Sequence, residues 1–179
     1  MKHNYAMLQI TAKKRLPLYM LLGSIAAIVF LVAYVAANGT GEGPVGEEFV
    51  NEELPPPGMF PYFLKPITWL MIVVFAGWFS FLELMKNQIK LLDDNWRYFY
   101  AMVLFIIVAI SFYEILYNFM YWGAILSKQP EAALDPDSVA NGFPSQLYQV
   151  NIVFATKVGV TIFACAMYAL VVIKFSSGK

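Results

Sequence analysis

The stretch LPLYMLLGSIAAIVFLVAYVAA, residues Leu16–Ala37, decides the fold class of this chain. It contains no charged residue, and as a helix it is long enough to cross a bilayer, which takes about 20 residues. The apolar region of a cleaved secretion signal is shorter than this. We therefore interpret the stretch, with the basic residues before it, as an uncleaved signal anchor and first transmembrane helix.

Three further apolar stretches follow, at residues 66–85, 98–122 and 151–175. The composition agrees, because 60% of the 179 residues are apolar and 13% are charged, against about 45–50% and about 25% in ordinary soluble domains. Long continuous apolar runs favour helices, since membrane strands alternate over roughly ten residues. The sequence predicts an all-α integral membrane protein, with residues 1–179 forming a single domain of four transmembrane helices.

The distribution of charge predicts the orientation. Basic residues precede the first span and follow the second, whereas eight acidic residues lie in the two long loops, 38–65 and 123–150. Basic segments stay on the cytoplasmic side of membranes. We expect a multi-pass protein of the cell membrane with both termini cytoplasmic (N-in and C-in) and both long loops external. The formal net charge of zero gives no indication of a nucleic-acid partner.

Two charged residues lie deep within the spans. Counted from the span ends at 1.5 Å per residue, Glu114 lies roughly 12 Å and Lys157 roughly 9 Å below the external interface. Intramembrane charges are costly and usually paired, so we predict an ion pair between them, supported by Asn118 and Thr156. In the alternative, Lys157 extends toward the interface and Glu114 binds another chain.

A third charged residue, Glu83, lies near the cytoplasmic end of the second span. It precedes Lys86 by three residues, a spacing that brings two side chains together on one side of a helix. We expect these two side chains to form an interfacial ion pair.

Small residues indicate where transmembrane helices can approach closely. We expect packing ridges on the first and fourth helices, and we interpret the single cysteine as a packing residue. The residues concerned are Gly23, Ala27, Ala155, Gly159 and Cys165.

Aromatic residues mark two further candidate surfaces. Met59, Phe60, Tyr62 and Phe63 in the first loop would be costly in water, so they form either a docking segment for a neighbouring subunit or a segment along the lipid headgroups. Tyr113, Tyr117 and Tyr121 repeat every four residues on the third helix. This stripe fits helix packing or subunit contact, and a quinone or lipid pocket is the alternative.

The residues of catalytic and cofactor sites are missing from the sequence. The single histidine is His3 in the basic tail, and the single cysteine excludes a disulfide within the chain. No spacing suits zinc, iron–sulfur, haem or copper. We expect no catalytic, metal-binding or cofactor-binding residue in this chain. Lipid is the one ligand that we keep as a possibility.

Four spans, a retained basic N-terminal anchor, acidic proline-bearing loops and no cofactor ligands resemble the small accessory subunits of energy-transducing membrane complexes. More narrowly, the chain resembles the small subunits that accompany the copper-dependent ammonia monooxygenase of archaea. That enzyme's metal-bearing subunits have intramembrane His and Asp ligands without counterpart here.

The resemblance implies a non-catalytic accessory subunit of a membrane oxidoreductase, in a hetero-oligomer with other integral membrane subunits. One alternative function is a small oligomeric transporter or channel that uses Glu114 and Lys157. Another is a membrane anchor that binds quinone or lipid at the tyrosine stripe.

Overall fold

The computed structural model describes residues 2–39, 48–50, 65–128 and 146–175, and these contain no strand. Four long helices form the fold: α1 (Lys2–Asn38), α3 (Pro66–Lys90), α4 (Asp94–Lys128) and α6 (Gln146–Phe175). Each is long and apolar enough to cross a membrane, and each predicted span lies within one of them. The prediction of an all-α membrane protein with four transmembrane helices is confirmed.

The helix ends follow local chemistry. α3 begins at Pro66, where the missing N–H of proline costs nothing because the first N–H groups of a helix lack partners. α1 begins at Lys2, well before the first predicted span, and contains Pro17. This proline lies near the start of the apolar part of α1, which runs from Arg15 to Asn38.

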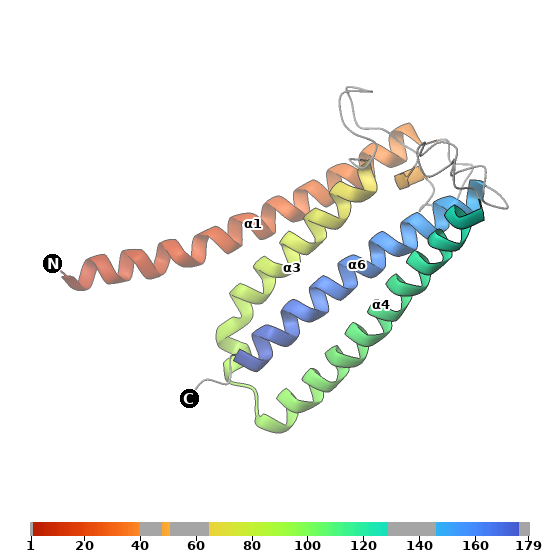
Figure 1. Cartoon of the computed structure of the whole chain (residues 1–179). Coiled ribbons are helices and arrows are strands. Elements are labelled where there is room, and N and C mark those ends of the chain that lie inside the picture. The colour runs from red at the N-terminus through yellow and green to blue at the C-terminus, as the bar shows by residue number, and fades with distance from the viewer. Residues whose placement is uncertain (1, 40–47, 51–64, 129–145, 176–179) are drawn as a thin grey trace.

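The four helices are arranged as an open row. Among the described residues, α1 packs on α3, α3 on α6, and α6 on α4 (Figure 1). α1 begins, and α6 ends, toward one end of the row, which we call the terminal end. α1 and α4 end, and α3 and α6 begin, at the opposite end, which we call the far end. The two edge helices, α1 and α4, each pack closely on one neighbour.

Buried apolar clusters hold the row together near both ends. The far-end cluster consists of Val35, Phe49, Val50 and Ile67. The terminal-end cluster consists of Leu82, Ile89, Ala169, Val172 and Ile173. Because lipid is as apolar as these side chains, shape-matched packing rather than exclusion from water stabilises these contacts.

α1 and α3 approach each other closely at Gly77. A Cβ atom added to Gly77 would lie 3.1 Å from the Cβ of Ser24 on α1. At Gly23, which is exposed and has nothing within 4 Å of an added Cβ, the predicted ridge makes no contact with the described chain. Consecutive residues point in different directions around a helix, and it is Ser24 that faces α3, while Ala27 is half-buried.

The small residues of α6 have different surroundings. Gly159 lies against α4, because an added Cβ would be 3.4 Å from Cγ1 of Ile115. Ala155 is exposed, so its predicted packing ridge is not covered by a described helix of the same chain. Cys165 is a half-buried free thiol beside α3.

Candidate functional site

Three polar contacts join α3 and α6 at different depths. They are the hydrogen bonds from Lys157 Nζ to Thr68 Oγ1 (2.7 Å), from Trp78 Nε1 to the Cys165 carbonyl (2.9 Å) and from Tyr168 Oη to Glu83 Oε1 (2.7 Å). Hydrogen bonds between membrane helices contribute about 0.6 kcal/mol on average. This polar seam fixes the register of the two central helices.

The predicted ion pair between Glu114 and Lys157 does not form within the chain. Lys157 bonds to Thr68 on α3, and Glu114 is exposed with no hydrogen bond or ion pair to the described residues. The reason is the orientation of α6 about its own helix axis. Gly159, two residues after Lys157, faces α4, so Lys157 points to nearly the opposite side, toward α3. The side chains of Glu114 and Lys157 therefore do not line a common path for an ion or substrate within one chain.

The two residues expected to support the pair have other roles. Thr156 Oγ1 donates to the carbonyl of Ile152 in its own helix, at 2.7 Å. Asn118 is only 7% exposed, and its side chain makes no hydrogen bond to the described part of the chain. Neither residue binds Lys157 or Glu114.

The expected pair between Glu83 and Lys86 is confirmed at 3.2 Å. Sequence reasoning missed that Tyr168 donates to the same carboxylate oxygen while its ring lies 4.7 Å from that of Phe79. Both Glu83 and Tyr168 lie toward the terminal ends of their helices, at comparable depth. This match in depth is the one signal that could have suggested the contact.

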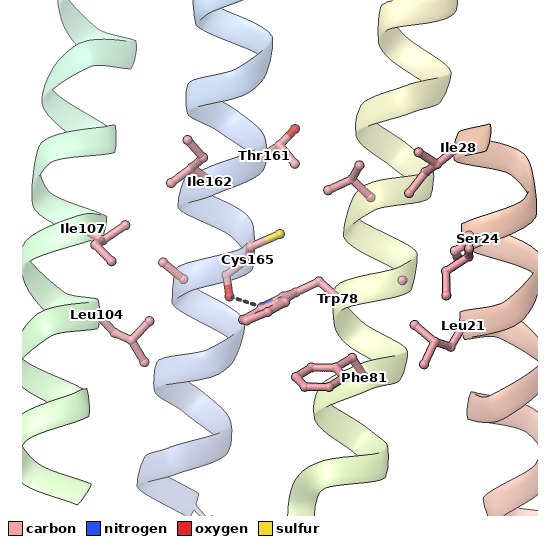
Figure 2. A pocket seen from close by; sticks show the side chains of 14 residues that line it. Leu21, Ser24, Ile28, Trp78, Phe81, Leu104, Ile107, Thr161, Ile162 and Cys165 are labelled. Atoms are coloured by element: carbon pink, nitrogen blue, oxygen red, sulfur yellow. Dashed lines mark hydrogen bonds between the residues drawn. The ribbon is translucent and has the colours of Figure 1, made fainter. Parts of the chain in front are cut away.

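An apolar groove runs along one side of the row. α1 and α4 form its walls, α3 and α6 form its floor, and its volume is about 610 Å³ (Figure 2). Figure 2 shows Leu21 and Ile28 of α1 on one side and Leu104 and Ile107 of α4 on the other. Apolar side chains dominate the lining, so the groove suits hydrocarbon or an apolar helix surface.

Two polar groups of the groove are already hydrogen-bonded within the chain. The Trp78 indole donates to a carbonyl of α6, and Thr161 Oγ1 donates to the Lys157 carbonyl at 2.9 Å. These donors are therefore not free to bind a polar head such as the carbonyls of a quinone.

The tyrosine stripe lies largely on the outward side of α4. Tyr113 and Tyr117 are exposed, with stacked rings whose centroids are 6.5 Å apart, and Tyr121 is half-buried. None of the three lines the groove. Exposed Glu114 lies in the same part of the helix, so α4 presents a carboxylate beside aromatic rings.

The remaining candidate residues, Met59, Phe60, Tyr62 and Phe63, lie outside the described residues. Within the part of the chain that is described, no group of three or more His, Cys, Asp or Glu side chains could hold a metal ion. The chain matches no known family model, and no similar curated protein or solved structure is found.

Proposed function

We propose that this chain is a non-catalytic subunit of a larger membrane complex. The observation that carries the proposal is Glu114, an exposed carboxylate in the membrane-spanning part of α4 with no bond to the described residues. Insertion experiments give a cost of about 2.5–3.5 kcal/mol for a charged residue at the centre of a transmembrane helix. A neighbouring chain that supplies a hydrogen-bond donor or a positive charge removes much of this cost.

The open row of helices supports the same proposal. α4 packs closely on α6 alone, and only 6% of its most apolar window is buried within the chain. Its exposed side combines large apolar residues with tyrosines, a composition suited to both lipid and protein contact. The chain thus has broad surfaces on which other subunits can pack.

The resemblance noted from the sequence suggests the class of complex, a membrane oxidoreductase of the ammonia monooxygenase kind. In this role the chain braces catalytic subunits from the lipid side, and the metal chemistry belongs to those subunits.

The test is purification of the tagged full-length chain from native membranes in a mild detergent, with native mass spectrometry. We expect a particle of constant stoichiometry that contains at least one other integral membrane chain. Recovery of the chain as a monomer, under conditions that keep other membrane complexes intact, would contradict the proposal.

A further inference from the structure

We propose that the groove, together with Glu114, receives one transmembrane helix of a different subunit, and that this helix carries a Lys or Arg level with Glu114. This inference rests on the proposed function and names the chemistry of the partner.

The helical repeat places the groove and the carboxylate on the same side of α4. Ile107 lines the groove, and Glu114 follows it by seven residues, which is close to two helical turns. Glu114 thus lies about 10 Å beyond Ile107, toward the far end. A helix lying along the groove meets apolar side chains first and the carboxylate next.

The carboxylate favours a helix over a lipid chain as the occupant. Hydrocarbon could fill the apolar groove, but an acyl chain has no donor for Glu114. Lipid head groups lie at the membrane surface, and Glu114 precedes Trp122, the last residue of the predicted third span, by eight residues, about 12 Å along the helix. Asn118, one turn beyond Glu114, is a largely buried residue whose side chain makes no hydrogen bond to the described residues.

A second copy of this chain does not supply the required positive charge. The basic residues near the ends of the described spans lie within about one helical turn of those ends: Arg15, Lys86, Lys90, Arg97 and Lys174. The basic residue deeper in these spans is Lys157, which is half-buried and bonded to Thr68 on α3. The occupant is therefore a helix of a different chain.

The first arm of the test is site-specific photocrosslinking of the full-length chain in native membranes. A benzophenone amino acid replaces Ile162, which lines the groove, or Val160, which lies on the other side of α6. The two positions are matched in exposure, at 44% and 46%. We expect at least tenfold more crosslinking from position 162, to an apolar helix of another subunit that contains a Lys or Arg.

The second arm changes the charge. We expect Glu114→Leu to lower recovery of that subunit about tenfold and Glu114→Lys to lower it further. Changing the partner's basic residue to Glu should then restore its recovery with the Glu114→Lys variant. The control is Leu116→Ala, at an exposed position on the opposite side of α4, which leaves recovery unchanged. Because Glu114 is exposed and makes no bond to the described residues, recovery of the chain itself should stay constant.

The outcomes separate the two proposals. If other subunits co-purify but position 162 crosslinks only to lipid, to a second copy, or no more than position 160, the groove assignment is overturned and the proposed function stands. Unchanged recovery of the subunit with Glu114→Leu also overturns the assignment. If no other membrane chain co-purifies with the unaltered protein, the proposed function itself fails.

Discussion

At the scale of single residues, Arg97 shows how one side chain closes a turn. Its guanidinium donates to the carbonyls of Lys90 (3.3 Å) and Leu92 (3.2 Å) and to Asp94 Oδ1 (3.1 Å). The last carbonyls of a helix lack partners within the helix, and this arginine supplies donors there. It thereby fixes the short connection from α3 to α4. Charge counting treats Arg97 only as a cytoplasmic base, because two of its three acceptors are backbone carbonyls that the sequence does not distinguish.

Tyr168 carries a testable prediction at the same scale. The change Tyr168→Phe removes the hydroxyl that donates to Glu83 but keeps the ring beside Phe79. We expect a loss of about 0.6–1.7 kcal/mol in the free energy of unfolding, which spans the average and the largest value measured for hydrogen bonds between membrane helices. Unfolding in mixed detergent and SDS micelles measures this loss.

The matched control for that measurement is Tyr113→Phe, at an exposed position on α4. A substitution there should change stability by less than about 0.5 kcal/mol. Equal effects of the two changes would show that the hydroxyl of Tyr168 contributes nothing special to the contact between α3 and α6.

At the scale of elements, the contact between α1 and α3 depends on a glycine that sequence reasoning did not select. We expect Gly77→Leu to destabilise the protein by about 1–3 kcal/mol, because the larger side chain pushes against Ser24 and separates the helices. Gly23→Leu should be neutral or slightly stabilising, since the added atoms meet open space and glycine is a poor helix former.

The pair of glycine variants is compared by the same unfolding measurement. Both changes gain helix propensity, so the difference between them reports packing alone. A Gly77 variant as stable as the Gly23 variant would show that α1 and α3 are not tightly packed at this depth.

At the scale of the whole molecule, the charge pattern predicts the orientation. In a Cys165→Ala background, a cysteine introduced at His3 should react with a membrane-impermeant maleimide only after permeabilisation of the cells. A cysteine introduced at Asn141 should react in intact cells, because its acidic loop is expected outside. The reverse labelling pattern would contradict the N-in and C-in prediction.

The sequence by itself determined the number and approximate limits of the four membrane helices. A charge-free apolar run of about 20 residues has few stable alternatives to a helix in lipid. It also determined the Glu83–Lys86 pair, because residues three apart in one helix are neighbours whatever the helix packs against.

Only the tertiary structure decided which side of each helix faces its neighbours. It placed Ser24 rather than Gly23 against α3, bonded Lys157 to Thr68 rather than to Glu114, and left Glu114 exposed. In a soluble protein, the polar side of a helix marks its orientation. In these spans apolar residues surround the whole helix, and lipid is as apolar as a buried interface, so the pattern of residues does not reveal which side is covered.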